Sequence, residues 1–248
     1  MFASIRFAAL ASLAFAFLCL PCQADQITVF SDGPLSTAMA HIAKDFQSAT
    51  GHTVQMAYGT APALREKLKA GEQPDVLISL AAEIDEMAKH NTFSTTEPSV
   101  ASIKLGLAVR NGAAPPDIKT LDGFKQTLVR ADTIIHNSLA SGLSFAKQLE
   151  RIGIAEQVKS KIIVIKGNTQ LVELARRTGN DVAAGQLTQL IASKDVQFVG
   201  ALPSEVQTET VYSAGALVVS KSPDVARSFV QFLASSKAAA IFSSVGAK

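Results

Sequence analysis

The sequence predicts an α/β protein of two lobes, each a mixed, mostly parallel sheet flanked by helices, with a ligand cleft between the lobes. Three observations lead to this fold class. Strand-like and helix-like segments alternate along the chain, as they do in βαβ units. The 248 residues, 48% apolar and 18% charged, can bury two cores. The last two helical segments have no strand of their own to cover.

The first part of the chain predicts three strand–turn–helix units. A buried strand is expected over 26–30, and the Ser31-Asp32-Gly33-Pro34 segment after it suits a helix start. Apolar residues from Met39 to Phe46 then recur at helical spacing, and Gly51 ends that helix. The next elements, in order, are strand 53–58, helix 63–70, strand 76–79 and helix 83–89. This succession is typical of a parallel sheet.

A second α/β unit follows a polar stretch at 92–99. Its expected elements are strand 104–109, helix 120–129, strand 133–136, a loop at 137–142, helix 144–152, strand 162–165, a helix near 171–175, strand 182–184, helix 187–191 and strand 197–199. A strand over 212–219 leads into two helices, over 225–233 and 238–242, which we expect to pack on the first lobe.

The chain should therefore cross between the lobes twice, near Ile103 and near Val211. These crossings set the predicted boundaries: residues 25–102 with 214–248 form the first lobe, and residues 103–213 form the second.

Residues 1–24 have the order of a cleaved secretory signal peptide. Arg6 precedes an apolar run over 7–20, and small residues precede Asp25. The run is shorter than the roughly 20 residues that span a bilayer, so a membrane anchor is the less favoured alternative. Cys19 and Cys22 both lie in this segment, so the mature chain would carry no thiol. We expect an exported, periplasmic protein without membrane insertion.

Composition and motifs exclude several function classes. The net charge of +2 and the absence of Trp give no reason to expect nucleic acid as a partner. The four His residues lack metal-ligand spacing, and the sequence has no P-loop, G-x-G-x-x-G or G-x-S-x-G motif. We therefore expect neither a metal nor a cofactor.

Several predicted strands end in a hydroxyl residue just before a helix. These residues are Ser31, Thr60, Ser79, Ser138 and Ser141. In parallel α/β sheets such strand ends face one crevice, where helix N-termini offer unpaired N–H groups to an anion. The alternative is that each residue only caps its helix or forms a turn. The pattern favours a site that holds a small anion with neutral donors.

Four segments resemble the periplasmic molybdate-binding proteins, which are type II solute-binding proteins of ABC importers. They are Ile27-Thr28-Val29-Phe30-Ser31, Tyr58-Gly59-Thr60-Ala61-Pro62, Pro74-Asp75-Val76-Leu77-Ile78-Ser79 and Tyr212-Ser213-Ala214-Gly215. The resemblance covers essentially residues 25–248 and implies the two-lobed type II periplasmic binding fold. It implies that the anion contacts Ser31, the turn at Thr60 and Ala61, the 138–142 loop and Tyr212.

Three departures from the family pattern favour an organic di- or tricarboxylate over molybdate. Asp32 follows Ser31 and would repel a dianion unless it faces away or caps its own helix. The second turn loses a donor at Ala61, and Gln186 suits an amide contact to a carboxylate. The chain looks closer to a divergent branch that also resembles a bacterial aconitate isomerase, which interconverts cis- and trans-aconitate.

Two hypotheses of function follow. The first is capture of a small anion by a monomer that serves an ABC permease. The second is aconitate isomerisation without a metal, for which His136 is the candidate proton carrier because it ends a strand beside Asn137. Tyr58 and Tyr212 could donate to a carboxylate, whereas Arg65 and Arg110 are more typical of solvated surface.

Overall fold

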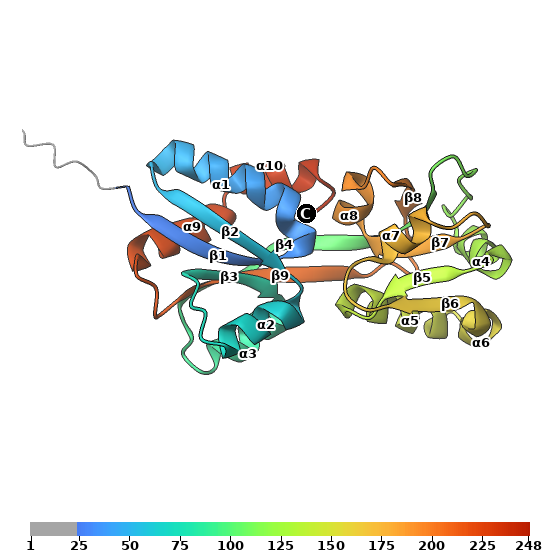
Figure 1. Cartoon of the computed structure of the whole chain (residues 1–248), viewed down its shortest axis with the longest axis horizontal. Coiled ribbons are helices and arrows are strands. Elements are labelled where there is room, and N and C mark those ends of the chain that lie inside the picture. Colours follow the sequence, from blue (N-terminus) through green and yellow to red (C-terminus); the bar gives the residue numbers. More distant parts are fainter. Residues whose placement is uncertain (1–23) are drawn as a thin grey trace, which may run out of the picture.

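The computed structural model describes residues 24–248, so the predicted signal peptide, apart from its last residue, lies outside the described residues. Two lobes lie side by side, and two long strands run from one to the other (Figure 1). The strands form one nine-stranded sheet, in which eight strands follow the order β2-β1-β3-β9-β4-β7-β5-β6 and β8 pairs with β4 outside this path. The predicted α/β fold class is confirmed.

The sheet of the first lobe is built on three parallel strands. β1 (Gln26–Asp32) lies between β2 (Thr53–Gly59) and β3 (Val76–Leu80). β9 (Glu209–Leu217) pairs antiparallel with β3, and this pairing sets Tyr212 opposite Leu80. The carboxyl ends of β1, β2 and β3 consequently share one edge of the sheet.

The sheet of the second lobe repeats this plan. β5 (Ile134–Asn137) lies parallel between β6 (Ile162–Ile165) and β7 (Val182–Gln186). β4 (Phe93–Arg110) pairs antiparallel with β7 and with β8 (Val196–Ala201).

β4 is much longer than predicted, because the polar stretch at 92–99 is its first part. Between Phe93 and Lys104 this strand pairs with β9 on one side, and on the other side it meets only an isolated bridge from Ile103 to Ala247, so it forms the edge of the first sheet in the described residues. From Phe93 to Pro98 the residues alternate between half-buried and exposed, which a polar sequence satisfies. From Leu105 onward β4 pairs with β7 of the second lobe.

Helices cover both faces of the first sheet. On one face lie α1 (Ser36–Thr50), which follows the short 3₁₀ helix η1 (Gly33–Leu35), and the last two helices, α9 (Pro223–Leu233) and α10 (Ser236–Ser244). Phe46 of α1 meets Phe229 of α9 edge to face, with ring centroids 5.1 Å apart. α9 and α10 both contact α1, and their apolar residues join its core cluster. The opposite face carries α2 (Ala61–Lys69) and α3 (Ala81–Ala88).

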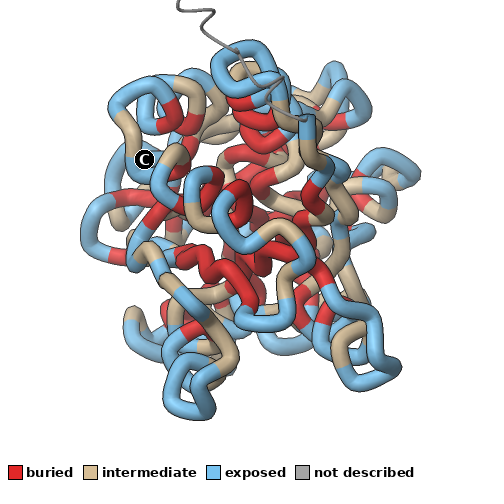
Figure 2. Tube along the Cα trace, turned by 90° about the vertical axis from the view of Figure 1, so that its left-hand side faces the viewer, coloured by how far each residue is buried: buried red, intermediate tan, exposed pale blue. Residues whose placement is uncertain are grey.

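The second lobe has its own core. α4 (Leu121–Arg130) and α5 (Ala140–Arg151) bury Phe124, Leu128 and Phe145 together with Leu105 of β4. The other face is covered by α7 (Gln170–Ala175) and α8 (Leu187–Ala192). The short α6 (Ala155–Val158) and η2 (Lys159–Lys161) lead into β6 and were not predicted. Seen end-on, the buried backbone lies inside a shell of exposed loops (Figure 2).

The crossing between the lobes is fixed by side-chain and terminal contacts. The Gln207 carboxamide accepts a hydrogen bond from Leu105 N (2.9 Å) and donates to Leu105 O (3.0 Å) and Leu202 O (3.1 Å). Ser102 exchanges two backbone hydrogen bonds with the C-terminal Lys248. The two connecting strands are thereby held together where they leave the first lobe.

Candidate ligand-binding site

A cavity of about 530 Å³ lies where the two lobes meet. The residues that line it come from the carboxyl ends of strands and the first turns of helices in both lobes. They are Asp32, Gly33, Pro34, Tyr58, Gly59, Thr60, Ala61, Pro62, Arg65, Leu80, Asn137, Ser138, Leu139, Ala140, Ser141, Leu143, Asn168, Gln186, Gln189, Thr210 and Tyr212.

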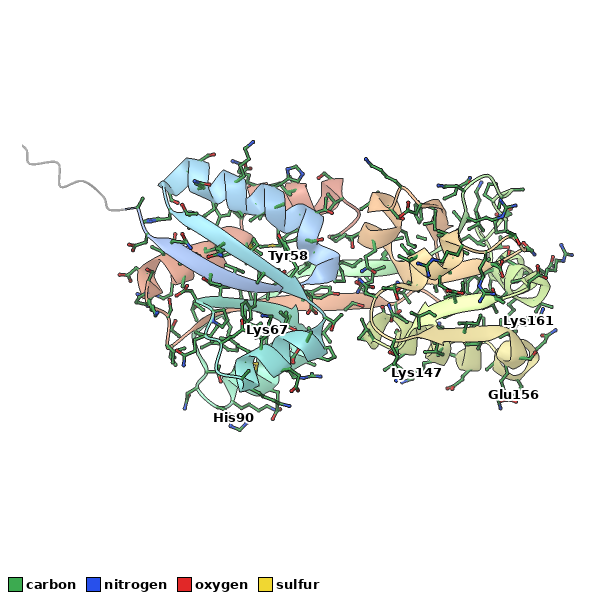
Figure 3. The ribbon with its side chains drawn as sticks, in the orientation of Figure 1. Tyr58, Lys67, His90, Lys147, Glu156 and Lys161 are labelled. Carbon is green, nitrogen blue, oxygen red and sulfur yellow. The ribbon has the colours of Figure 1, made fainter. Side chains whose placement is uncertain are left out.

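The first-lobe wall is the start of α2. Thr60 is in extended conformation and caps the helix, because its Oγ1 accepts a hydrogen bond from Ala63 N (3.4 Å). Pro62 stands in the first turn, where its missing N–H costs nothing. Tyr58, at the end of β2, lies on the side of the first lobe that faces the second (Figure 3).

The second-lobe wall is the start of α5, which begins at Ala140 rather than at the predicted Ser144. Asn137 organises this turn: its Oδ1 accepts hydrogen bonds from Leu139 N (3.0 Å) and Gly142 N (3.1 Å). Gly142 is required here, since a Cβ would lie 1.8 Å from the Asn137 carbonyl oxygen. The first turn of α5, with Ser138 before it and Ser141 inside it, thus faces the cavity.

Tyr212 and Gln186 join the two sheets beside the cavity. The Tyr212 hydroxyl lies 2.8 Å from Gln186 Nε2 and 3.1 Å from Gln186 Oε1. Tyr212 belongs to β9 of the first sheet and Gln186 to β7 of the second. Burial raises the pKa of the Tyr212 phenol, so this group remains a neutral hydrogen-bonding partner.

Asp32 is the carboxyl group of the cavity wall. Its residue is only 4% exposed, and it does not cap η1. Its Oδ1 is buried without a hydrogen-bond partner. Burial, reinforced by the nearby charge of Glu83 and opposed by Arg65, raises the pKa of Asp32 from 3.8 to about 7.

Arg65 is the cation of the cavity wall, and it is already paired. Its Nη1 donates to Glu83 Oε1 (3.0 Å), and the Ser79 hydroxyl donates to Glu83 Oε2 (2.6 Å). The Arg65 side chain is 49% exposed. Ser79 therefore supports the Arg65–Glu83 pair and is not among the residues that line the cavity.

The structure brings most of the predicted ligand-binding residues together. Six of them line the cavity: Thr60, Ala61, Ser138, Ser141, Gln186 and Tyr212. Ser31 does not; it is fully buried, and its hydroxyl lies 3.4 Å from the Asp32 carbonyl oxygen. Arg65 lines the cavity, although the sequence favoured a solvated surface position, whereas Arg110 does not.

His136 is also absent from the cavity wall. Its ring packs against Phe145, with centroids 5.7 Å apart, and Nδ1 lies 2.9 Å from the Asn137 carbonyl oxygen. The role of His136 as proton carrier stays a prediction. Its ring does not line the cavity, so it has no direct contact with a ligand bound there. Cavity residues that sequence reasoning missed are Asn137, Asn168, Gln189 and Thr210.

Two further properties concern residues 24–248. No set of three His, Cys, Asp or Glu side chains in this range is arranged to hold a metal ion. No helix in the same range is long and apolar enough to cross a membrane.

Comparisons with known proteins agree with this fold. The family model for bacterial extracellular solute-binding proteins matches residues 27–248. An aconitate isomerase of Pseudomonas sp. is 28% identical over 229 residues, which cover 90% of this chain and 87% of that protein. A putative ABC transporter substrate-binding lipoprotein of Bacillus subtilis is 22% identical over 231 residues, covering 89% and 85%.

The structure is similar to that of the periplasmic molybdate-binding protein of Azotobacter vinelandii, with a TM-score of 0.71 and 17% identity over 90% of this chain and 98% of that one. This likeness extends over both lobes. The chain therefore belongs to the family of bacterial extracellular solute-binding proteins.

Proposed function

We propose that the protein binds a small organic di- or tricarboxylate between its lobes and delivers it to an ABC permease. The observation that carries this proposal is the pair of helix N-termini, of α2 and α5, that face one cavity from opposite lobes. Helix N-termini favour anions. Micromolar affinity requires about −8 kcal/mol, and each hydrogen bond to a charged group contributes roughly 1.5–3 kcal/mol.

An organic anion fits the cavity better than an inorganic oxyanion. The wall includes apolar side chains such as Pro34, Pro62, Leu80 and Leu143, which suit a carbon skeleton. The amide nitrogens of Gln186 and Asn137 already donate one hydrogen bond each, to Tyr212 and Ser141, and the second N–H of each amide can donate to a carboxylate. Arg65 adds one cation from the first lobe.

Thermal unfolding with a panel of anions tests the proposal. Cis- and trans-aconitate, citrate and malate are compared with molybdate and sulfate. A ligand at 100 times its Kd stabilises the folded state by about 2.7 kcal/mol, which raises Tm by roughly 5–10 °C in a chain of this size. We expect this rise with di- or tricarboxylates only. A rise confined to molybdate or sulfate would overturn the proposal.

A pair of arginine variants provides the matched control. Arg65→Gln should reduce the carboxylate-induced rise in Tm, because it removes the cation of the cavity wall. Arg227→Gln changes an arginine on α9, which pairs with Asp224 and does not line the cavity, and should leave that rise intact.

Isomerisation of aconitate is the second candidate function. The Pseudomonas relative is an aconitate isomerase, and the cavity holds a carboxyl group, Asp32, whose pKa of about 7 suits proton exchange near neutral pH. In this reaction a base removes a proton from the methylene carbon, the double bond shifts, and the proton returns to the carbon that was vinylic. The donors of the cavity would stabilise the dienolate formed between these steps.

Incubation with cis-aconitate in D2O, followed by chromatography and mass spectrometry, tests this candidate. Conversion to trans-aconitate with deuterium on carbon would support the isomerase, and binding without conversion would support capture alone. Asp32→Asn and His136→Gln then compare the two candidate proton carriers. The variant at the true carrier should lose about 100-fold or more in turnover.

A further inference from the structure

We propose that Asp32 takes up one proton when a polycarboxylate enters the cavity and then donates that proton in a hydrogen bond to a ligand carboxylate. The residue would thereby couple ligand capture to pH and select ligands with an ionised carboxylate at this point. This inference rests on the proposed binding of carboxylates and names the residue that sets their specificity.

The position of Asp32 supports a direct contact with the ligand. The residue ends β1 and lies opposite Gly59, the last residue of the neighbouring β2, one position after Tyr58. Asp32 lines the cavity, although the residue as a whole is only 4% exposed. Oδ1 is itself buried and has no hydrogen-bond partner among residues 24–248, so these residues do not stabilise an ionised carboxylate there, which favours a protonated Asp32 beside a ligand carboxylate.

The charges around Asp32 do not neutralise an ionised carboxylate. Glu83 on α3 repels it, and Arg65 on α2 attracts it but is already bound to Glu83. The phenols of Tyr58 on β2 and Tyr212 on β9 both have pKa values raised by burial and stay neutral. β3 and α8 carry no titratable side chain.

A ligand carboxylate beside an ionised Asp32 would add a second repulsion in a poorly hydrated place. Protonation removes this cost and replaces it with an O–H···O⁻ hydrogen bond, which is about twice as strong as a neutral one. The bound state therefore holds a proton that the free state gives up as the pH rises through the pKa of Asp32, about 7.

The linkage has a definite sign and size. Below pH 6 Asp32 is already protonated in the free protein, so binding requires no proton uptake. Above pH 7 each complex must take up one proton, and the affinity falls. With a free-state pKa of about 7, the Kd should rise about tenfold between pH 6 and pH 8.

The test measures binding of trans-aconitate by calorimetry at pH 6, 7 and 8, in buffers of different ionisation enthalpy. At pH 8 the wild type should take up about one proton per ligand. Asp32→Asn, which resembles the protonated carboxyl in shape, should show neither the proton uptake nor the tenfold change in Kd. Asp85→Asn, at an exposed carboxylate on α3 outside the cavity wall, should keep both.

A second variant tests the electrostatic argument without altering Asp32. Glu83→Gln removes the negative charge that raises the pKa of Asp32, so the pH at which affinity falls should move down. A wild-type Kd that is constant from pH 6 to 8, or an Asp32→Asn profile that follows the wild type, would overturn the inference. Failure of the whole anion panel to bind would instead overturn the proposed function, because no proton linkage would then have been measured.

Discussion

At the scale of the residue, Asp32 is kept in the cavity wall at a cost in stability. The pKa of Asp32 is about 7 in the folded protein, against 3.8 for an ordinary Asp. Between these two pH values Asp32 is protonated in the folded state but ionised in the unfolded state. The folded state then binds more protons, so the stability that Asp32 contributes falls as the pH rises from about 4 to about 7. A ligand-binding role accounts for retaining such a residue.

Asp32→Asn should remove this pH dependence. Relative to the wild type, the variant should become more stable as the pH rises from 4 to 7, by up to roughly 4 kcal/mol, and the difference should be constant above pH 7.5. Urea unfolding of both proteins across this pH range measures the difference in their free energies of unfolding. The other carboxyl groups are common to both proteins, so their contributions cancel in this difference. A difference that does not change with pH would show that Asp32 has an ordinary pKa.

The sequence indicated the cavity residues in part, and the reason is geometrical. Thr60 and Ser138 follow strands directly, Ser141 stands in the first turn of the helix after β5, and parallel strands end at one edge, so their position could be predicted. Ser31 precedes the cavity-lining Asp32 in β1, where successive side chains point to opposite faces. The sequence alone does not determine which of these two adjacent polar residues, Ser31 or Asp32, faces the cavity.

At the scale of the element, the start of α5 depends on one glycine. Gly142 lets the Asn137 backbone and side chain approach the first turn of the helix, and so shapes the loop that carries Ser138. Helical spacing predicted the body of α5 but not its first turn, because that turn is set by the Asn137 side chain rather than by apolar periodicity.

The polar part of β4 was not predicted for a related reason, since an edge strand needs no apolar run.

Gly142→Ala should displace the second-lobe wall. The added Cβ would lie 1.8 Å from the Asn137 carbonyl oxygen, so the helix start must move, at a cost of about 1–3 kcal/mol or more. Carboxylate affinity should fall more than ten-fold (~1.4 kcal/mol). Gly200→Ala is the control, because its Cβ would meet only Ile118 at 3.7 Å. Calorimetry and urea unfolding separate the two effects, and equal behaviour of both variants would contradict the assigned role.

At the scale of the whole molecule, the two lobes are joined through β4, which pairs with β9 of the first sheet and with β7 of the second. Gln207 binds both backbone groups of Leu105, where β4 changes partner from β9 to β7.

Gln207→Ala should destabilise the fold by about 1–3 kcal/mol, because Leu105 N loses its hydrogen-bond partner. The matched variant Gln231→Ala, at an exposed position on α9, should cost less than about 0.5 kcal/mol. Equal costs would exclude a special role for Gln207.

The return of α9 and α10 to the first lobe has a consequence for the order of folding. Residues from both ends of the chain complete one core: Met39 and Phe46 pack with Phe229 and Phe242. The second core, in contrast, is made from one continuous stretch between Leu105 and Val206. During synthesis the second lobe can therefore fold once Val206 has been made, whereas the core of the first lobe stays incomplete, and accessible to chaperones, until α9 and α10 follow.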